Sequence, residues 1–387
     1  MRIGIDARSL HYEGVGRYIK ELIRNLSALD RSNEYIVYFL SEQSLMENAV
    51  KQSNFHNTVL QIGIYDLHKQ PCLYYRLYRD NLDIFHATDH WIVPFIATCP
   101  VVVTVNDVLV MTARKNLSCK VLIYGTIVTR IALSTAKRII AVSDFARKEV
   151  VEMIPRTEKK ISVIYHGVGE EFTPHGDSEI SVIRKKYQID KRYILYVGSL
   201  KSHKNVPRII EAFSRLPVSV RQKTDLVIAA RLESRFSNVI KLPSLFGIEN
   251  NVRFAGYVPT RDLPALYSGA DAFILPSLTE CFGLPIIEAM ACGVPVMASK
   301  AGAIPEIGGD AGIYFDPEST DDIYHTMLRM LTDEGLRKRL SDMGLERSKN
   351  FSWKITAQKI LQVYEDVYRQ NRILKQERQP VESSPYL

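Results

Sequence analysis

Two glutamates in the second half of the chain, Glu280 and Glu288, have the setting that points most clearly to chemistry. Gly283 between them lets the backbone approach a ligand closely, and Pro285 suits the first turn of a helix that Gly293 would end. The N–H groups at the start of such a helix attract anions, so we expect a diphosphate to bind there. One carboxylate could then face a sugar while the other accepts hydrogen bonds from ribose hydroxyls.

An alternation of strands and helices along the chain would position these glutamates. Runs such as Val101–Val105 are apolar on both faces, as are strands of a parallel sheet covered by helices. The alternation indicates βαβ units and therefore an α/β fold with doubly wound sheets. Amphipathic stretches predict helices at Gly16–Leu29, Val206–Leu216 and Asp321–Leu331. Short apolar runs predict strands at Ile3–Ile5, Tyr35–Leu40, Ile84–His86, Val101–Val105, Ile139–Val142, Ile161–Ile164, Tyr193–Val197, Leu226–Ala229, Val252–Phe254, Ala272–Leu275 and Val294–Ala298.

The alternation pauses once, in the polar and turn-rich segment Gly167–Gln188. We therefore place a domain boundary near residue 176, with a sheet of similar size on either side. Two such sheets would face each other across a cleft, and open α/β sheets bind ligands at the carboxyl ends of their strands. After Trp353 the chain starts as a helix, and it becomes polar from about Gln376, where we expect a disordered tail over 376–387.

Composition narrows the functional classes. The chain has 387 residues and a formal net charge of +7, but its charges are spread along the sequence and form no basic stripe, so we exclude nucleic acid as a partner. Five scattered cysteines without a CxxC pair predict a reduced, cytoplasmic protein without a disulfide framework or a zinc cluster. No apolar run approaches the roughly 20 residues of a membrane span. Any membrane contact would be peripheral, at the inner face, and the run Tyr74–Arg79 is either a lipid- or acceptor-binding surface or a half-buried helix face.

The segment from Glu280 to Glu288, followed by Ala-Met-Ala-Cys-Gly-Val-Pro-Val, resembles the signature of the retaining GT-B glycosyltransferases of family 4. The resemblance implies two facing Rossmann-like domains with a cleft between them and a C-terminal helix that crosses back. The first domain would be 1–176 together with a helix at about 364–375, and the donor domain would be 177–363. Four further motifs carry the resemblance: Gly14–Gly16, Tyr196–Ser199 with Lys204-Asn205, Gly256–Val258, and Phe351–Trp353.

The resemblance implies a role for each matching residue. Lys204 would neutralise the donor diphosphate, Glu288 would bind the ribose, and Glu280 would contact sugar hydroxyls. Tyr257 and Val258 would border the base. The implied donor-binding residues are Gly16, Gly198, Ser199, Lys204, Tyr257, Val258, Glu280, Phe282, Gly283, Leu284 and Glu288. The implied catalytic residues are Glu280, Lys204 and Asp107, and the candidates on the acceptor side are Gly14, Asn106 and Asp107.

We expect neither a metal ion nor a cofactor. The sequence contains no Asp-x-Asp pair, the motif with which many other glycosyltransferases hold a divalent ion. Lys204 and helix N-termini would then stabilise the charge on the leaving diphosphate. Because no carboxylate is an obvious covalent nucleophile, the retention that the family implies favours front-face transfer assisted by the leaving group.

Two positions depart from the family pattern. Ser199 stands where many members have a basic residue, and either Lys201 or Arg231 is a candidate to replace that charge. Asn106-Asp107 stands where His-Asp is common. An asparagine can hydrogen-bond a sugar hydroxyl, but it cannot relay a proton at neutral pH.

The leading hypothesis is a retaining hexosyltransferase that uses a nucleotide-diphosphate sugar, with GDP-mannose as one candidate. Its acceptor would be a saccharide or a lipid-linked glycan, as in bacterial surface-polysaccharide mannosyltransferases. Two alternatives stay open: a sugar-phosphate synthase or phosphorylase of the same fold, and a non-catalytic nucleotide-sugar-binding subunit of a transferase complex. The sequence does not determine the base, sugar, linkage, acceptor or oligomeric state.

Overall fold

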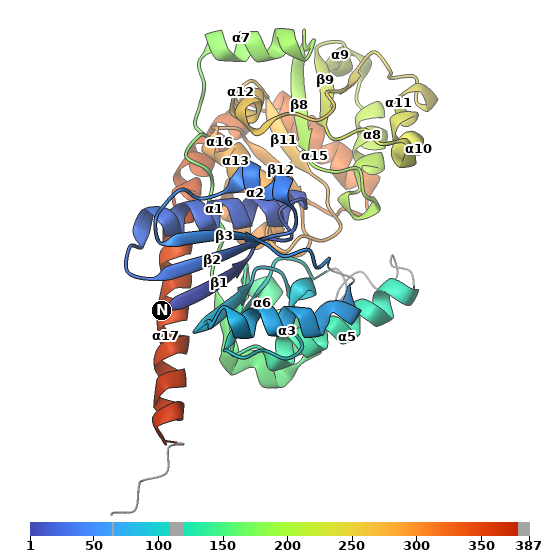
Figure 1. Ribbon diagram of the computed structural model, residues 1–387. Coiled ribbons are helices and arrows are strands. Elements are labelled where there is room, and N and C mark those ends of the chain that lie inside the picture. Colours follow the sequence, from blue (N-terminus) through green and yellow to red (C-terminus); the bar gives the residue numbers. More distant parts are fainter. Residues whose placement is uncertain (64–65, 109–118, 378–387) are drawn as a thin grey trace, which may run out of the picture. The chain divides into compact units, whose positions relative to one another are not determined.

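The computed structural model describes residues 1–63, 66–108 and 119–377 (Figure 1). The chain divides into two compact units, each built around its own sheet. Unit 1 comprises Met1–Val142, Ala146–Tyr165 and the C-terminal residues from Trp353. Unit 2 comprises Ser143–Phe145 and His166–Ser352.

Unit 1 is built on a seven-stranded parallel sheet. Its strand order is β3 (Phe55–Val59), β2 (Glu34–Phe39), β1 (Arg2–Asp6), β4 (Ile84–Ala87), β5 (Val101–Val105), β6 (Arg138–Ala141) and β7 (Ile161–Val163). The chain adds strands in one direction from β1 and in the other from β4, so right-handed crossovers place helices on both faces. Ligands of such sheets bind at the carboxyl ends of the strands where this direction reverses, here between β1 and β4.

The helices of unit 1 bury one face each. In α1 (Glu13–Leu29) the residues Tyr18, Leu22 and Leu26 recur at helical spacing, and each is at most 1% exposed. The other helices are α2 (Glu42–Asn48), α3 (Gln70–Arg79), α5 (Cys119–Thr135), α6 (Asp144–Met153) and α17 (Trp353–Glu377), with short 3₁₀ turns η1 (Leu67–Lys69), η2 (His90–Ile92) and η4 (Pro155–Lys160).

A chain of buried hydrogen bonds ties α17 to the sheet of unit 1. His86 in β4 contacts the hydroxyl of Tyr364 through Nδ1 at 2.5 Å and the hydroxyl of Thr104 through Nε2 at 2.8 Å. The hydroxyl of Tyr18 contacts that of Thr104 at 2.9 Å. Burial lowers the pKa of His86 to about 3, so the ring is neutral at neutral pH and offers one donor and one acceptor.

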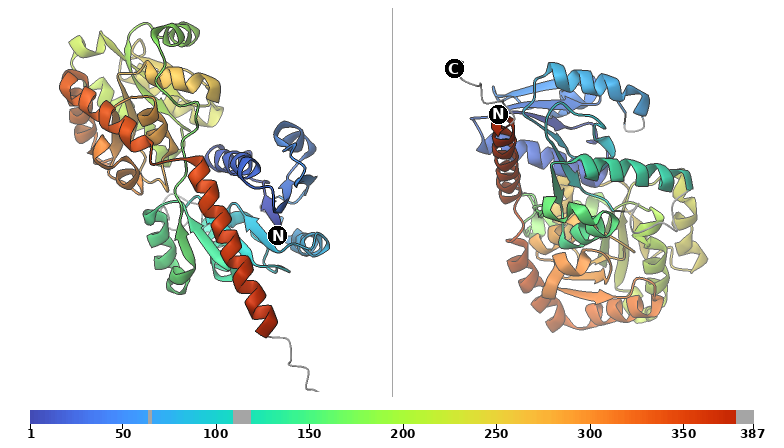
Figure 2. Two further views of the ribbon diagram at one scale, coloured as in Figure 1. Left: turned by 90° about the vertical axis from the view of Figure 1, so that its left-hand side faces the viewer. Right: turned by 90° about the horizontal axis from the view of Figure 1, so that it is seen from below.

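The C-terminal helix α17 is continuous over 25 residues (Figure 2). The sequence assigned only residues 364–375 to the first domain, whereas the whole helix belongs to unit 1. The reason is an apolar face that begins at its first residue, since the ring of Trp353 already packs at 6.4 Å from that of Tyr18. The helix runs to Glu377, just past the predicted limit at residue 376, and the rest of the predicted tail lies outside the described residues.

Unit 2 has the same doubly wound topology as unit 1, built on a six-stranded parallel sheet. The direction of strand addition reverses between its two central strands. The strand order is β10 (Val252–Phe254), β9 (Thr224–Ala229), β8 (Arg192–Val197), β11 (Ala272–Leu275), β12 (Val296–Ser299) and β13 (Gly312–Phe315). The helices are α7 (Asp177–Lys186), α8 (Val206–Ser214), α9 (Val218–Arg221), α10 (Ser237–Ile240), α11 (Leu242–Leu245), α12 (Leu263–Ser268), α13 (Leu284–Ala291), α14 (Ile304–Gly308), α15 (Thr320–Thr332) and α16 (Glu334–Ser348), with 3₁₀ turns η5 (Ser202–Lys204), η6 (Ser234–Phe236), η7 (Thr260–Asp262) and η8 (Gly309–Ala311).

The turn-rich segment 166–176 belongs to unit 2, whereas the sequence placed it in the first domain. Side-chain packing explains the difference. The ring of Phe172 meets that of Tyr267 edge-on, with centroids 6.1 Å apart, and the backbone N–H of His175 donates to Ser268 Oγ at 3.0 Å. The segment therefore folds against α12 before the next helix begins.

Each strand predicted from the sequence is present, with ends that differ by a residue or two. The elements that the sequence did not predict include the edge strands β3 and β13 and the helix α7. The edge strand β3 reads Phe-His-Asn-Thr-Val and is only partly buried, so it lacks the apolar run that marks a central strand. Helix α7 buries only Ile183, so its amphipathic spacing is weak.

Candidate functional site

The donor-site candidates of unit 2 lie where its strand order reverses, between β8 and β11. Lys204 ends the turn η5, which follows β8, and Glu280 lies in the loop that follows β11. A backbone hydrogen bond joins the two loops, with Leu278 N donating to His203 O at 2.8 Å. The doubly wound fold therefore brings together residues that are far apart in the sequence, at the edge where such sheets bind ligands.

Asn205 fixes the direction in which the chain leaves Lys204. It adopts the left-handed conformation with φ 58°, which asparagine tolerates better than most residues. Its side-chain amide is buried and donates to Pro276 O at 3.1 Å and to Pro317 O at 2.8 Å. These bonds anchor the end of η5 to the segments that follow β11 and β13.

Lys204 and Glu280 form an ion pair. The ammonium Nζ lies 2.5 Å from Glu280 Oε1, and the hydroxyl of Ser277 donates to the same oxygen at 2.6 Å. The two charged side chains are 22% and 15% exposed, so the pair is partly shielded but open to a ligand. An ammonium has three donor positions, which leaves Lys204 able to hydrogen-bond an anion while it holds the carboxylate.

A glycine, Gly302, packs against the backbone of Glu280. Gly302 has φ +59°, and a Cβ built on it would lie 2.4 Å from Glu280 O and 2.7 Å from Glu280 N. The neighbouring Ala303 donates its backbone N–H to Glu280 O at 2.9 Å. The loop after β12 thus sets the position of the Glu280 backbone, and only glycine fits at residue 302.

The predicted helix after Glu280 is confirmed as α13. Gly283 precedes it in the left-handed conformation, Leu284 is its first residue, and Gly293 follows its end with φ +75°. Glu288 lies inside this helix and is 3% exposed. The hydroxyl of Tyr267 donates to Glu288 Oε2 at 3.0 Å, which orients the buried carboxylate.

Phe282, at the start of this loop, is held by an aromatic cluster within unit 2. Its ring meets those of His166 and Phe351 edge-on, with centroids at 4.9 Å and 5.9 Å. Burial lowers the pKa of His166 to about 3, so this ring is uncharged at neutral pH. The packing fixes the backbone immediately before α13, where a bound anion would approach.

The stretch after β8 is shaped by Gly198. Its φ is +153°, and a Cβ there would lie 2.8 Å from the hydroxyl oxygen of Tyr196. That hydroxyl donates to Ser199 O at 2.7 Å, which closes the turn, and Ser199 itself is half-buried. Within the described residues neither Lys201 nor Arg231 hydrogen-bonds Ser199, so no other basic side chain takes the place of the missing one at that position.

The candidate base-binding residues differ in exposure. Tyr257 is 60% exposed and Val258 is buried at 7%. The guanidinium of Arg231 lies 5.1 Å from the centre of the Tyr257 ring, a cation–π geometry. Together they present a flat, cationic surface of the kind on which a nucleotide base stacks.

His203, beside the ion pair, was not predicted as a site residue. Burial and the neighbouring positive charge of Lys204 lower its pKa to about 4. The ring is therefore neutral at neutral pH. Ser277, Tyr267 and Gly302 were also missed in their roles, because each acts through a contact that only the folded chain reveals.

In unit 1 the glycine-rich loop that the resemblance implied is wrong, because Gly14 and Gly16 lie in the first turn of α1. The helix predicted from Gly16 is present and begins three residues earlier, at Glu13. A Cβ on Gly16 would lie 2.1 Å from Leu10 O, whereas one on Gly14 would meet nothing within 4 Å. Gly16 is thus required for the close approach of the first turn to the preceding chain. A backbone contact of Gly16 with a diphosphate stays a prediction.

Asn106 and Asp107 directly follow β5 and are both half-buried. The amide of Asn106 donates from Nδ2 to Thr88 O at 2.7 Å, and the hydroxyl of Thr88 donates to Asp6 O at 2.5 Å. The ends of β1, β4 and β5 are therefore hydrogen-bonded to one another. The bond to a carbonyl also fixes the amide orientation, since the reversed amide would set two oxygens against each other.

Three buried polar atoms at this edge of unit 1 have no hydrogen-bond partner in the described chain: Asn106 Oδ1, Ser9 Oγ and His90 Nδ1, the last of which lies 3.3 Å from Asp89 Oδ1 without forming a hydrogen bond to it. Ser9 follows β1 and is 0% exposed, and His90 follows β4 and is 1% exposed. Unsatisfied buried groups cost stability and often mark sites that a ligand or water completes. The sequence foresaw Asn106 but not Ser9 or His90.

Among residues 1–63, 66–108 and 119–377, no group of three or more His, Cys, Asp and Glu side chains is arranged to hold a metal ion. Within the same ranges no helix combines the length and the apolar character needed to cross a membrane.

The chain resembles known proteins over nearly its whole length. The family model described as Glycosyltransferase Family 4 matches residues 12–172, and that described as Glycosyl transferases group 1 matches residues 179–347. The O-antigen chain mannosyltransferase B of Escherichia coli is 30% identical over 370 residues, which cover 91% of this chain and 95% of that protein. The chain belongs to glycosyltransferase family 4. It therefore has a glycosyltransfer role in glycan biosynthesis.

Further matches to this family 4 glycosyltransferase agree. The serotype-specific mannosyltransferase WbdA of Escherichia coli is 32% identical over 226 residues, which are 57% of this chain but 28% of WbdA. A crystal structure of the Anabaena protein HepE in complex with UDP and glucose superimposes with a TM-score of 0.77 at 20% identity, covering 95% of this chain and 100% of that one. This likeness shows that the two proteins share the GT-B fold, as the sequence predicted.

Proposed function

We propose that this glycosyltransferase moves a hexose from a nucleotide-diphosphate sugar to a saccharide or lipid-linked acceptor, with retention and without a metal ion. The observation that carries the proposal is the 2.5 Å pair of Lys204 and Glu280, at the strand ends that precede α13. A cation and a helix N-terminus suit a diphosphate, and a neighbouring carboxylate suits a sugar hydroxyl.

In the proposed donor complex each group has one task. The Lys204 ammonium and the backbone at the start of α13 hold the diphosphate. The buried carboxylate of Glu288, oriented by Tyr267 at 3.0 Å, accepts hydrogen bonds from the ribose hydroxyls. Glu280 accepts a hydrogen bond from the sugar, and the base lies against Tyr257.

The proposed reaction breaks the bond between the anomeric carbon and the diphosphate oxygen. The acceptor hydroxyl forms the new bond on the same face, and its proton passes to the departing diphosphate oxygen. Lys204 stabilises the negative charge that develops on that oxygen. Glu280 does not act as the nucleophile in the proposed reaction, because its Oε1 already accepts hydrogen bonds from Lys204 and Ser277.

The acceptor would bind to unit 1. Asn106 Oδ1 has no partner in the described chain and can accept a hydrogen bond from an acceptor hydroxyl. The run predicted to be either a lipid-facing or a half-buried helix face lies on α3, where Leu73 and Leu77 are buried while Tyr75 and Tyr78 are 63% and 65% exposed. The exposed tyrosines support a peripheral contact with a membrane that carries the acceptor.

The donor proposal is tested with a panel of GDP-, UDP- and ADP-sugars. We expect one of them to raise the melting temperature and to release its nucleoside diphosphate slowly, with GDP-mannose as the first candidate because two relatives are named mannosyltransferases. Glu280→Gln should abolish release, whereas Glu249→Gln, an exposed acid of the same unit, should not. The anomeric configuration of the product, measured by NMR, tests retention.

The same panel decides between the alternatives. A chain that binds a nucleotide sugar but turns over with no acceptor is a non-catalytic subunit. A chain that transfers only to a sugar phosphate or to inorganic phosphate is a synthase or phosphorylase. If no member of the panel changes the melting temperature, the donor site itself is wrong.

A further inference from the structure

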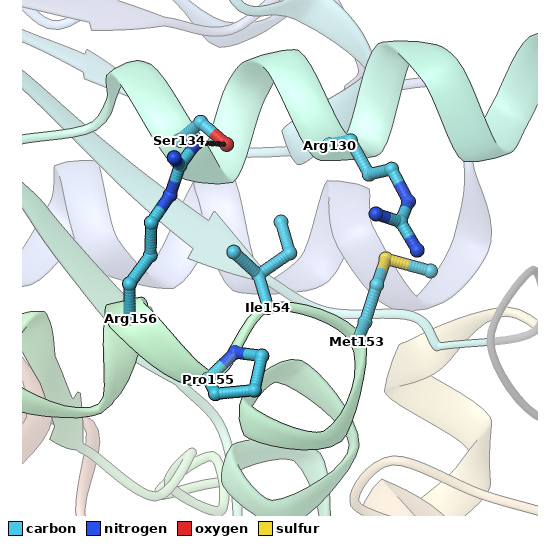
Figure 3. Close-up of a pocket in the computed structure, with 6 residues that line it drawn as sticks. All are labelled: Arg130, Ser134, Met153, Ile154, Pro155 and Arg156. Carbon is cyan, nitrogen blue, oxygen red and sulfur yellow. Dashed lines mark hydrogen bonds between the residues drawn. The ribbon is translucent and has the colours of Figure 1, made fainter.

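A pocket of unit 1 lies at a different place from every residue discussed so far. It has a volume of about 470 Å³ and is lined by Arg130 and Ser134 of α5 and by residues 153–156, which join α6 to η4 (Figure 3). The last turn of α5 precedes β6, and η4 precedes β7, so the pocket lies at the amino edge of the parallel sheet. Asn106 follows β5 at the opposite, carboxyl edge.

The two segments that form this pocket carry a concentration of positive charge. Residues 130–138 and 153–160 contain six basic side chains and one acidic side chain, Glu158. Glu158 lies 3.7 Å from Arg147, outside these segments, and is largely exposed. The basic residues are Arg130, Lys137, Arg138, Arg156, Lys159 and Lys160.

The described contacts of these cations are with neutral oxygens. Arg156 donates to Ser134 Oγ at 2.9 Å, as Figure 3 shows, and Lys160 donates to the carbonyl oxygens of Ser134 and Ala136 at 3.2 and 3.0 Å. Arg130 has no hydrogen bond or ion pair within the described residues and is exposed. Among the residues that the structure describes, no carboxylate pairs with these guanidinium groups.

The electrostatic consequence is visible at Lys160. Its pKa is lowered by burial and by the positive charges of Arg156 and Lys137. Such mutual repulsion is relieved by an anion bound nearby. Met153, Ile154 and Pro155 line the pocket between the two arginines. Because these side chains are apolar, the pocket could also accept an apolar group attached to the anion.

We propose that this pocket binds the phosphate group of an organophosphate, with Arg130 and Arg156 as its ligands. Guanidinium groups match the geometry of phosphate oxygens and form charge-assisted hydrogen bonds with them. The apolar lining accommodates the group that the phosphate carries. Both an anionic lipid headgroup and a soluble phosphate ester present this chemistry.

The test uses the full chain, the double variant Arg130→Gln/Arg156→Gln, and Arg31→Gln as a matched control. Arg31 is an exposed arginine between α1 and β2, so it lies at the same amino edge of unit 1. The probes are glycerol 3-phosphate, measured by calorimetry, and vesicles of phosphatidylcholine with or without phosphatidylglycerol, measured by co-sedimentation. Arg130→Gln alone removes no internal bond of the described chain, so it separates loss of binding from loss of folding.

We expect wild type to bind at least one probe and the double variant to bind it at least tenfold more weakly, with Arg31→Gln unchanged and Arg130→Gln intermediate. Binding only to vesicles that contain phosphatidylglycerol identifies a lipid source, and binding to glycerol 3-phosphate identifies a soluble one. The proposal is overturned if wild type binds neither probe. It is equally overturned if the double variant binds as wild type does, or if Arg31→Gln loses as much binding as the double variant.

Discussion

Replacing Gly302 by alanine tests how the structure positions Glu280. The new methyl group would lie 2.4 Å from Glu280 O and 2.7 Å from Glu280 N, both backbone atoms that no side-chain rotation can move away. The residue also has φ +59°, a left-handed conformation that an alanine adopts at a cost of about 1–2 kcal/mol. The loop must therefore shift, and Glu280 must move with it.

A second glycine separates these two effects. Gly247 in the same unit has φ +65°, but a Cβ there would meet nothing within 4 Å. Gly247→Ala should lower the free energy of unfolding only by the cost of placing an alanine in the left-handed conformation, about 1–2 kcal/mol. For a unit of this size, that lowers the melting temperature by about 2–8 °C. Gly302→Ala adds an overpacking term of about 1–3 kcal/mol, so its melting temperature should fall further.

Activity distinguishes the variants more sharply. A displacement of about 1 Å at a reacting group lowers rate by about 100-fold, so donor turnover by Gly302→Ala should fall by about that factor. Gly247→Ala should keep turnover near wild type at a temperature where all three proteins are folded. The measurements are thermal melting and nucleoside-diphosphate release. If Gly302→Ala matches Gly247→Ala in both, Gly302 does not position Glu280 and the reasoning is refuted.

Three further outcomes are expected. Lys204→Ala should lower donor turnover by about 100-fold or more, because one charge-stabilising donor is lost. Lys223→Ala, at an exposed lysine of the same unit, should not lower it, and equal effects would contradict the role of the Lys204–Glu280 pair. Burial holds the pKa of His86 at about 3 instead of 6.5, so the unfolded chain takes up a proton below pH 6.5 that the folded chain takes up only near pH 3. The free energy of unfolding should therefore decrease as the pH is lowered through this window, by up to about 1.4 kcal/mol per pH unit. His86→Gln, compared with wild type by urea unfolding at several pH values, should show a smaller decrease. Parallel curves for the two proteins would contradict a buried neutral ring. Asn106→Ala should raise the acceptor KM while leaving acceptor-free donor hydrolysis unchanged, and a loss of hydrolysis alone would show that Asn106 serves the donor.

The central strands were predictable from the sequence because burial on both faces leaves a continuous apolar run, as in Val101–Val105. The edge strand β3 contains polar residues and is only partly buried, and β13 offers only three apolar residues after Gly312, so neither was predicted. A glycine-rich loop at Gly14–Gly16 was expected only from the family resemblance, and the amphipathic pattern placed Gly16 at the start of a helix. The contact of Gly16 with Leu10 O, which makes a glycine necessary in the first turn of α1, is a tertiary feature that spacing does not contain.

The candidate site divides in the same way. The resemblance gave Lys204 and Glu280 separate roles, in binding the diphosphate and the sugar. Their 2.5 Å contact depends on β8 and β11 being neighbours in the sheet. Ser277 precedes Glu280 by three residues, and its hydrogen bond follows from the loop conformation. Gly302 comes from another strand end, and no local pattern links it to Glu280. The sequence therefore named both members of this ion pair, but it did not reveal the residues that hold the pair in place.

The central claim is that unit 2 holds the donor nucleotide and that Glu288 binds its ribose. Isothermal titration of the full chain with the nucleoside diphosphate of its donor tests this most directly, with Glu288→Gln as the variant. Glu318→Gln, an exposed acid of the same unit, is the control. The account predicts that Glu288→Gln binds at least tenfold more weakly while Glu318→Gln binds as wild type. Equal affinity in all three proteins would contradict it.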